Sequence, residues 1–521
     1  YIPQTFGKVF EPFGGVSLGP NAVLDTDGTG ILEIEGEPLA IHAESSSWSF
    51  LSAGELAAFQ RMKGLRFDEL RRSWPGQARA SASDFTAHLY RRGLISINGH
   101  RAVDAAMFHE SANYNEGNLV ELLLTEKCNL ACPYCLAGAN KSMPTMDWEI
   151  GKKAVDLAFG MMNTRTLAFE FAGGEPFLQF ALMKRLTEYI RNHPFRLGRT
   201  LFLSVQINAT LINDERAAWL KENDIRAGIS VDGGAAAQNK SRPQVNGRPS
   251  FPLLMNGIET LKKHGVSFGA LVVLNRYNSG PPGELIEFLL ANRIHGFRLN
   301  PVVFIGDARK NWNEVGLTQS EVLAYFQSMI RSIASNGHLL LEDNVRSMLD
   351  FLTSKQRRTR CMRSQCGAGD TFQAVAANGD IYPCGRGTQS PGLKLGNIFD
   401  EGLRSLDEPG SRNSVIGEIR ERRPHKMEEC RSCDYRQLCQ SGCSAQAWER
   451  HGSVMHRTPE CSFYKTMYPY LMRWLSFDGQ AFDALNRCSY FGNQGVRVDH
   501  DFAGAPAMPP PPNQWTAAQR I

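Results

Sequence analysis

The cysteines constrain this chain most, because eleven of the twelve lie in two short groups. The first group is Cys128-x3-Cys132-x2-Cys135, and the second spans residues 361–461. The first residues show no basic stretch followed by an apolar one, so we expect no secretory signal and a cytoplasmic location. In such a chain, tight groups of cysteine indicate metal centres rather than disulfides.

The composition is that of a globular protein with several domains. A length of 521 residues predicts two to four domains, and the contents of 42% hydrophobic and 21% charged residues are ordinary. The formal net charge of +4 is too small to indicate binding to nucleic acid or to an anionic membrane. The longest apolar runs, such as residues 119–124, are far shorter than the ~18 residues of a membrane span.

In the region 117–340, strand-like segments alternate with helical ones. This alternation implies a parallel sheet with right-handed crossovers. Six units are fewer than a closed eight-unit barrel needs, so we predict an α/β fold with an open, TIM-like (β/α)6 barrel and functional residues on the loops after the strands. Strands are expected at 119–125, 167–171, 201–207, 227–232, 268–274 and 297–301, and helices at 150–161, 182–190, 215–220, 254–263 and 284–290.

The region 1–116 has a different pattern and is expected to form a small winged-helix-like domain. Ser52 and Glu55 can form a capping box at the start of its first helix, and Leu51 can pack onto Leu56. Weak strands are expected within 22–42, helices near 51–62, 67–72 and 83–92, and a wing strand at 93–97.

The first cysteine group directly follows the first strand of the barrel, so it lies on a functional loop. Three thiolates with this spacing can hold three irons of a [4Fe–4S] cluster and leave the fourth iron open. The amino and carboxylate groups of S-adenosylmethionine can chelate that iron, and reductive cleavage then releases a 5′-deoxyadenosyl radical. The alternative of half a zinc site fits less well, because structural zinc takes four ligands.

These residues resemble the radical SAM superfamily. A CxxxCxxC loop after a β-strand is the signature of that superfamily, and residues 172–176, which follow the second strand, resemble its GGEP motif. The resemblance implies that this motif holds the amine of the bound methionine, with glycines that let the backbone approach the ligand. A plain turn is the alternative. The residues so implied at the cofactor are Ala172, Gly173, Gly174, Glu175 and Pro176, together with Tyr134 of the cysteine loop.

Two later segments extend the resemblance. Asn208 matches a family residue that faces the ribose, although Ala209 stands where the family has Gly, and a loop Asn satisfied by its neighbours is the alternative. Ser230 and Arg242 match residues that bind the methionine carboxylate in related peptide-modifying enzymes. A planar guanidinium suits a carboxylate because it offers paired, charge-assisted donors. A solvated surface arginine is the alternative.

The second cysteine group resembles the SPASM domain, which binds two auxiliary [4Fe–4S] clusters. Its apolar content looks sparse, so metal is expected to hold this region together. If Cys361 is not a ligand, one auxiliary cluster keeps an open iron; zinc sites with four cysteines each are the alternative. Cys488 is left as a free buried thiol. The resemblance implies Cys361, Cys366, Cys384 and Cys443 for one cluster, and Cys430, Cys433, Cys439 and Cys461 for the other.

The combined pattern predicts a radical SAM/SPASM peptide maturase with three [4Fe–4S] clusters. The region 1–116 resembles, by pattern alone, the recognition element that binds the leader of a precursor peptide as an added strand; a structural cap on the barrel is the alternative. The radical is expected to abstract a hydrogen from a ribosomally made peptide and to install a thioether, C–C or C–O crosslink or a related modification. We expect the precursor peptide and a reductant such as flavodoxin or ferredoxin as partners, and neither nucleic acid nor a membrane.

Two other functions are weighed against this prediction. A sulfatase-type maturase forms formylglycine, but its family has an acidic base directly after the cysteine that corresponds to Cys384, and this chain has Gly385. Asp380 and Tyr382 are nearby candidates for proton transfer. A non-catalytic electron carrier or scaffold would leave the GGEP segment and Arg242 without a role. The expected divisions are 1–116, the barrel at 117–340, the SPASM domain at 341–475 and a tail at 476–521.

Overall fold

The computed structural model describes residues 18–74, 81–103, 118–140, 142–161, 166–335, 340–354, 361, 366–406 and 414–478. None of the helices in these segments is long and apolar enough to cross a membrane. The tail beyond Asp478, including Cys488, lies outside the described residues.

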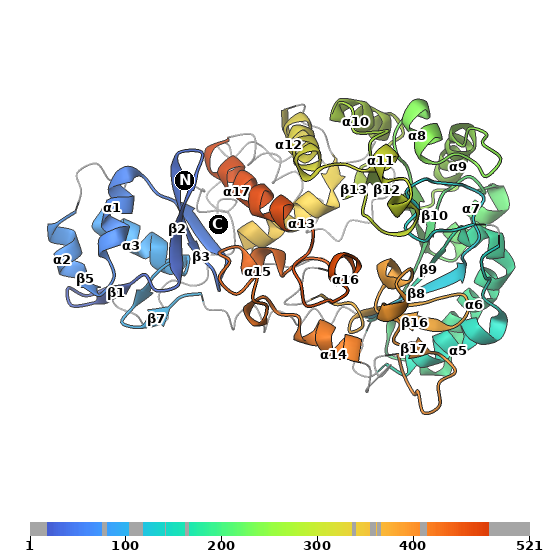
Figure 1. Cartoon of the computed structure of the whole chain (residues 1–521), viewed down its shortest axis with the longest axis horizontal. Coiled ribbons are helices and arrows are strands. Elements are labelled where there is room, and N and C mark those ends of the chain that lie inside the picture. Colours follow the sequence, from blue (N-terminus) through green and yellow to red (C-terminus); the bar gives the residue numbers. More distant parts are fainter. Residues whose placement is uncertain are drawn as a thin grey trace.

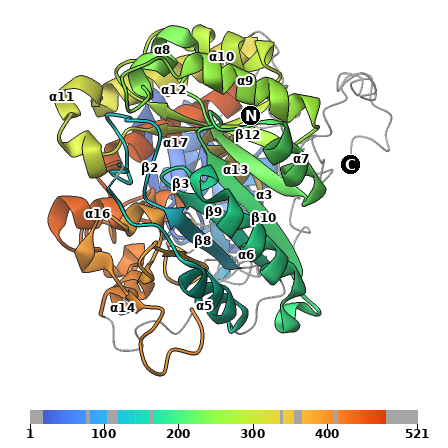
Figure 2. The ribbon, with the colours of Figure 1, turned by 90° about the vertical axis from the view of Figure 1, so that its right-hand side faces the viewer.

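A ten-stranded sheet organises the molecule, with the order β14-β13-β12-β11-β10-β9-β8-β15-β16-β17. Strands β8 to β13 are parallel neighbours, and helices follow them on the outer face of the sheet (Figure 2). The predicted open barrel of six βα units is therefore confirmed. The strands are β8 (Asn118–Thr125), β9 (Thr166–Gly173), β10 (Thr200–Ile207), β11 (Ile225–Ser230), β12 (Phe268–Leu274) and β13 (Gly296–Pro301), and the helices are α5 (Trp148–Phe159), α6 (Phe180–Asn192), α7 (Asp214–Glu222), α8 (Ala235–Ser241), α9 (Phe251–Lys263), α10 (Pro282–Ala291), α11 (Trp312–Val315) and α12 (Gln319–Ser335).

Alternating side chains explain why these strands form a barrel wall. In β9, Leu167, Phe169 and Phe171 are fully buried in the core beneath the helices. The side chains between them point to the opposite, inner face of the sheet, which we call the lumen face, because successive residues of a strand alternate. Glu170 is on this lumen face, so an ionisable side chain lies inside the barrel at this position.

The cysteine-rich region continues the barrel sheet. β15 (Phe372–Val375) pairs in parallel with β8 and carries the antiparallel strands β16 (Asp380–Tyr382) and β17 (Gly396–Asn397). The sheet thus crosses the boundary that we placed at residue 340, and the edge strand β14 (Leu341–Glu342) extends it at the other end.

The expectation that the cysteine-rich region has little apolar core is wrong. Buried side chains such as Ile416, Leu438 and Tyr468 belong to the same core as the barrel. They come from helices that the cysteine pattern did not predict. These helices are α13 (Asp343–Ser354), α14 (Ser414–Glu421), α15 (Arg436–Cys439), α16 (Ser444–His451) and the long α17 (Cys461–Phe477).

The N-terminal region has its own core and the predicted capping box. Ser52 accepts from the backbone of Glu55, whose side chain accepts from the Ser52 backbone. Two small sheets accompany three helices, which agrees with a winged-helix-like arrangement. The elements are β1 (Val23–Asp25), β2 (Thr29–Ile34), β3 (Glu37–His42), β4 (Ser47–Phe50), α1 (Ala53–Arg61), β5 (Leu65–Arg66), α2 (Phe67–Arg72), α3 (Ala82–Arg91), β6 (Ser96–Ile97) and β7 (His100–Arg101).

The sheet β2-β3-β4 connects this region to the rest of the molecule. In β3, Ala40 packs into the N-terminal core, whereas Leu39 and Ile41 pack into the main core. The rings of Phe50 and Phe477 are 5.0 Å apart. Figure 1 shows the sheet between helices α1 and α3 on one side and α17 on the other, so the N-terminal region docks through a buried face.

Candidate functional site

The structure brings the three cysteines of the first group together at the end of β8. Burial raises the pKa of the Cys128 thiol to about 11, and the nearby Glu175 and Cys135 contribute. Burial also raises the pKa of Cys132, Arg242 lowers it, and Cys135 and Cys128 raise it further. The three thiols therefore lie close together beside the GGEP segment.

The GGEP segment lies against the backbone of the cysteine loop. A Cβ atom on Gly173 would be 2.1 Å from the carbonyl oxygen of Thr125, and one on Gly174 would be 2.2 Å from that of Lys127. The Gly174 amide donates to Thr125 over 2.7 Å, and the Glu175 amide donates to Lys127 over 2.9 Å. These glycines thus permit a close approach to the end of β8 and to the cysteine loop. The approach of their backbone to the ligand stays a prediction.

Glu175 is held inside the protein by backbone amides. It is 1% exposed, and its carboxylate accepts from the amides of Asn208 (2.8 Å) and Phe177 (3.1 Å). Burial raises its pKa to about 7 despite these hydrogen bonds. Ala172 is half-buried, and the buried Pro176 starts a short 3-10 helix, Pro176–Gln179. Glu175 thus ties the loop after β9 to the loop after β10.

Asn208 also joins neighbouring loops. Its side-chain amide nitrogen Nδ2 donates to Asn129 over 2.8 Å and lies 3.9 Å from the sulfur of Cys128. Its side-chain oxygen accepts from the backbone amide and the hydroxyl of Thr210. Ala209 has a φ of 60°, a left-handed conformation that favours glycine. This geometry gives the physical reason why Gly suits the place where this chain has Ala.

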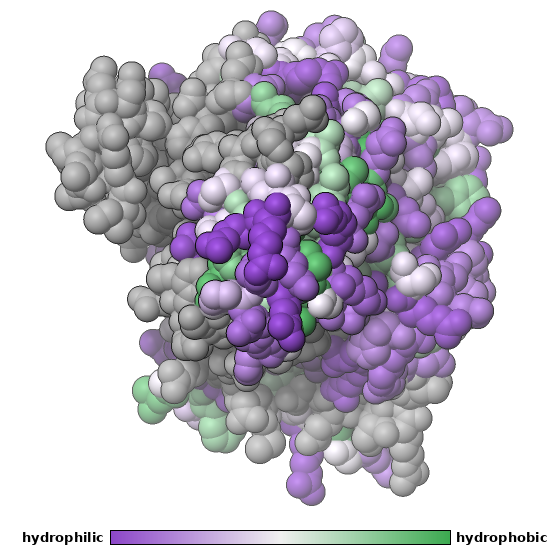
Figure 3. Space-filling view, turned by 90° about the vertical axis from the view of Figure 1, so that its left-hand side faces the viewer, coloured by the Kyte–Doolittle hydropathy of each residue, from purple (hydrophilic) through white to green (hydrophobic). Residues whose placement is uncertain are grey.

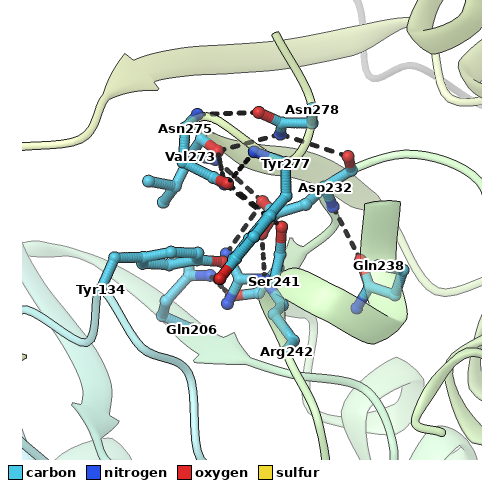
Figure 4. Close-up of polar contacts among 11 residues, drawn as sticks. Tyr134, Gln206, Asp232, Gln238, Ser241, Arg242, Val273, Asn275, Tyr277 and Asn278 are labelled. Carbon is cyan, nitrogen blue, oxygen red and sulfur yellow. Dashed lines mark hydrogen bonds and ion pairs between the residues drawn. The ribbon is translucent and has the colours of Figure 1, made fainter. Parts of the chain in front are cut away.

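A buried carboxylate that we did not assign a role dominates the region around Arg242 (Figure 4). Asp232 accepts from Arg242 Nε (3.0 Å) and Nη2 (3.2 Å), from the Val273 amide (3.0 Å) and from the Tyr134 hydroxyl. The guanidinium also lies 5.4 Å from the centre of the Tyr134 ring. The chain itself therefore supplies one carboxylate to Arg242 and uses two of its five donors. Ser230, 9% exposed, accepts from Gln206 over 3.3 Å.

Two more carboxylates that the sequence analysis missed lie on the lumen face. Glu121 of β8 is directly paired with Glu170 of β9, and Glu170 accepts from Ser204 over 3.2 Å. Desolvation and the neighbouring Glu170 raise the pKa of Glu121, which accepts from the Gly385 amide. A Cβ atom on residue 385 would be 2.3 Å from Glu121 Oε2. The Glu121 carboxylate thus fills the space that a side chain after Cys384 would occupy.

Asp380 and Tyr382 lie on β16. Burial tends to raise the pKa of Asp380, but hydrogen bonds from Lys394 (2.5 Å between Nζ and Oδ1) and Asn397 lower it overall. Tyr382 is buried, and desolvation raises its pKa. Through the pairs Tyr382–Ala374 and Ala374–Glu121, Tyr382 lies on the same face of the sheet as Glu121.

The cysteines that the resemblance assigned to the first auxiliary cluster lie close together. Desolvation raises the pKa of Cys384, and the thiols of Cys443, Cys366 and Cys361 raise it further. Part of Cys361 is exposed, but desolvation and the thiols of Cys366 and Cys443 raise its pKa as well, to about 12. We call Cys361, Cys366, Cys384 and Cys443 the first quartet.

The other four clustered cysteines line one small hollow. Burial raises the pKa of Cys439 to about 12, and the thiols of Cys433, Cys430 and Cys461 contribute. We call Cys430, Cys433, Cys439 and Cys461 the second quartet. Within the described segments, no three His, Cys, Asp or Glu side chains are placed to hold a single metal ion. A [4Fe–4S] cluster binds one thiolate at each of its four irons, so the four thiols of each quartet match the ligand set of one cluster.

Comparison with known proteins agrees with this geometry. Residues 122–289 match the model of the radical SAM superfamily, and residues 366–434 match that of the SPASM iron–sulfur cluster-binding domain. An uncharacterised protein of Methanocaldococcus jannaschii is 30% identical over 299 residues, which cover 57% of this chain and 94% of that protein. A serine-type anaerobic sulfatase-maturating enzyme of Bacteroides thetaiotaomicron is 26% identical and matches 62% of this chain and 81% of its own length.

Solved structures share the fold. Native anSMEcpe with bound AdoMet has a TM-score of 0.60 at 21% identity, covering 71% of this chain and all of that one. SuiB of Streptococcus suis bound to the precursor peptide SuiA has a TM-score of 0.50 at 14% identity, covering 85% of this chain and 99% of that one.

The contact between Gly174 and Lys127 leads to a first prediction. Gly174→Ala forces the GGEP segment away from the cysteine loop, and a backbone shift of this kind costs about 1–3 kcal/mol. We therefore expect S-adenosylmethionine to bind the iron-loaded protein about ten- to hundredfold more weakly, measured by equilibrium dialysis. Gly280→Ala is the matched control, because a Cβ atom there meets nothing within 4 Å. Equal affinity in the two variants would contradict the role of this contact.

Proposed function

Because the chain belongs to the radical SAM superfamily and carries a SPASM domain, we propose that it is a peptide maturase with three [4Fe–4S] clusters. The first cysteine group would hold one cluster, and the two quartets would hold two auxiliary clusters. When bound, the first cluster and S-adenosylmethionine supply a radical that abstracts a substrate hydrogen. A new bond to the substrate carbon then requires a proton acceptor and an electron acceptor.

The observation that carries the proposal is the open edge of β2 in the N-terminal region. The pairs Gly28–Ala43 and Ile34–Glu37 define the hydrogen-bonded positions of the β2–β3 ladder. By alternation, the backbone N–H and C=O groups of Ile31 and Glu33 point outward. No hydrogen bond from these two backbones to another described segment is found outside the ladder. A peptide can therefore add as a strand at this edge.

The opposite edge of the sheet suits a peptide less well. All four residues of β4 are buried, and Arg92, which follows α3, donates to the Trp48 carbonyl over 3.1 Å. The face of the N-terminal region in Figure 3 is mostly hydrophilic, with only small apolar areas in its described part. Recognition through backbone hydrogen bonds at β2 agrees with such a surface.

Among the described lumen residues, Glu121 is the proton acceptor that we favour. Its carboxylate, paired with that of Glu170, has a raised pKa and lies beside the first quartet. The Asp380 carboxylate is less suitable because Lys394 and Asn397 already hold it in its charged form. With a radical centre bound between the candidate cofactor residues and the first quartet, the group that bonds to the radical carbon would lose its proton to Glu121. The remaining electron would pass to the first auxiliary cluster, so that one C–X bond forms as one X–H bond breaks.

A sulfatase-type maturase is the second candidate, since six similar proteins from Bacteroides, Clostridium and Klebsiella species are anaerobic sulfatase-maturating enzymes, at 23–26% identity. The N-terminal region with its open β2 edge favours the peptide maturase. In either case the reductant is proposed to be a flavodoxin or ferredoxin.

The iron content tests the cluster assignment. We expect about twelve irons per chain after anaerobic reconstitution, and about four fewer in the variant with Cys128, Cys132 and Cys135 all changed to Ala. That variant should release no 5′-deoxyadenosine from S-adenosylmethionine. The matched control changes the second quartet to Ala, which should also remove about four irons but spare S-adenosylmethionine binding. Zinc in place of iron, or cleavage by the first variant, would contradict the assignment.

The β2 edge can be tested with two substitutions at one exposed position. Glu33→Pro removes the outward N–H of residue 33 without affecting the ladder to β3, whereas Glu33→Ala removes only the side chain. With a peptide encoded by a short reading frame beside the gene, we expect about tenfold weaker binding for Glu33→Pro, the size of one lost hydrogen bond. Fluorescence anisotropy of the labelled peptide measures this. Unchanged affinity in Glu33→Pro would exclude the β2 edge.

The role of Glu121 can be separated from cofactor cleavage. Glu121→Gln keeps an acceptor for the Gly385 amide but cannot take a proton, so peptide modification should fall by about a hundredfold or more while 5′-deoxyadenosine is still released. Mass spectrometry of the peptide and chromatography of the nucleoside measure the two. Glu342→Gln is the control, because Glu342 is a buried carboxylate that accepts from the Leu299 and Val345 amides away from the lumen. A Glu121→Gln enzyme with full modification rate would disprove the role.

A further inference from the structure

Arg422 is a buried cation that the proposed reaction does not yet use. It directly follows α14 and is 1% exposed. Its Nε donates to the Val454 carbonyl over 2.6 Å, and its Nη2 donates to the carbonyls of Ser441 (2.9 Å) and His456 (2.6 Å). Three fixed hydrogen bonds therefore determine where the guanidinium lies.

The third nitrogen of this guanidinium lacks a hydrogen-bond partner among the described residues. Arg422 Nη1 is buried and makes no hydrogen bond within the described part of the chain. A buried N–H group of a charged side chain without an acceptor is costly, and such groups are normally satisfied. The orphaned nitrogen thus indicates an acceptor that is bound in the loaded protein.

The surroundings of Arg422 identify the acceptor's chemistry. Burial lowers the pKa of the guanidinium, and four thiols counteract this: Cys366 and Cys443 of the first quartet, and Cys430 and Cys439 of the second. Arg422 therefore lies near cysteines of both quartets. Sulfur is the acceptor that two iron–sulfur clusters would present to it.

The backbone explains how one side chain reaches both quartets. Cys439 of the second quartet and Cys443 of the first are only four residues apart. Gln440, Ser441 and Gly442 between them all have positive φ values of 51°, 63° and 69°, so the chain turns sharply there. The Ser441 carbonyl that Arg422 binds lies at the centre of this turn.

We propose that Arg422 is a shared positioning residue of the two auxiliary clusters, which donates through Nη1 to cluster sulfur and raises the reduction potentials of both. A cation and N–H···S hydrogen bonds stabilise the reduced form, which carries one more negative charge. The proposal rests on the assignment of the two quartets to clusters.

A second arginine provides an internal comparison. Arg386 lies close to the first quartet, with Nη1 4.0 Å from the sulfur of Cys443, and the first-quartet thiols of Cys361 and Cys384 also face it. Replacing Arg386 should therefore affect one auxiliary cluster, and replacing Arg422 should affect two. Arg420, an exposed residue of α14 that pairs with Asp370, is the matched control.

The experiment uses the full chain carrying Cys128→Ala, Cys132→Ala and Cys135→Ala, reconstituted so that only the auxiliary clusters remain. Titration with dithionite, followed by electron paramagnetic resonance, gives the midpoint potential of each. In Arg422→Met we expect both one-electron equilibria to shift at least tenfold toward the oxidised form, which corresponds to about 59 mV. Arg386→Met should shift the midpoint potential of one auxiliary cluster, and Arg420→Met should shift that of neither. Unchanged potentials in Arg422→Met with about eight irons retained would overturn the proposal.

A purely structural role for Arg422 is distinguished by two further measurements. Arg422→Lys keeps the positive charge but loses the planar set of N–H donors. The reduction potentials of the auxiliary clusters in this variant should therefore stay close to those of the unchanged chain, even if the variant binds less iron. The second measurement uses the Arg386→Lys variant with ¹⁵N-labelled arginine, so that Arg386 contributes no signal. Pulsed electron paramagnetic resonance of its reduced clusters should show a hyperfine coupling to a guanidinium nitrogen. The absence of that coupling would overturn the proposal even if the Arg422 variants fail to fold. An iron content near zero before any Arg422 change would instead disprove the cluster assignment itself.

Discussion

The pairing of β8 on both of its edges is the constraint on which the site depends. β9 pairs with one edge and β15 with the other, so the barrel and the cysteine-rich region share this strand. The cysteine loop leaves the end of β8, and Cys366 and Cys384 flank the strands β15 and β16 beside it. A shift of one residue in either register would move Glu121 from the lumen face to the helix face. Both pairings are therefore needed to place the cysteine loop and the first quartet around one space.

Buried charge near the candidate cofactor residues is stable only because it is paired. Asp232 is 1% exposed, and Arg242, Val273 and Tyr134 all donate to its carboxylate. Removing such a carboxylate from water is unfavourable unless most of its lone pairs accept hydrogen bonds. The pairing also orients Arg242, because the guanidinium is planar and two of its nitrogens are fixed on Asp232. The remaining donors then face a defined direction, which is what recognition of a small anionic group requires.

The sequence predicted those features that depend on local spacing. The six βα units, the capping box at Ser52 and the two cysteine groups follow from periodicity and from distances along the chain. The pair of Glu121 and Glu170 was missed because the two carboxylates are 49 residues apart in the sequence and become neighbours only through the register of β8 with β9. Arg422 looks like one more arginine in a charged segment, and only the folded chain shows it buried near four cysteines, two from each quartet. The pairing of β15 with β8 was also missed, because short buried strands give little periodic signal in the sequence.

The two quartets are coupled by the covalent chain as well as by charge. Because Cys439 and Cys443 belong to different quartets, the turn between them fixes how closely the two groups approach. Thr458 packs against this turn, since a Cβ atom on Gly442 would be 2.2 Å from its methyl carbon, and its amide donates to the Ser441 carbonyl. The same carbonyl oxygen also accepts from Arg422, so it holds both the loop before α17 and the buried guanidinium by hydrogen bonds. A change that loosens this turn would alter the spacing of the quartets and their electrostatic environment together. The distance and the driving force for electron transfer between the proposed auxiliary clusters therefore depend on the three-residue turn 440–442.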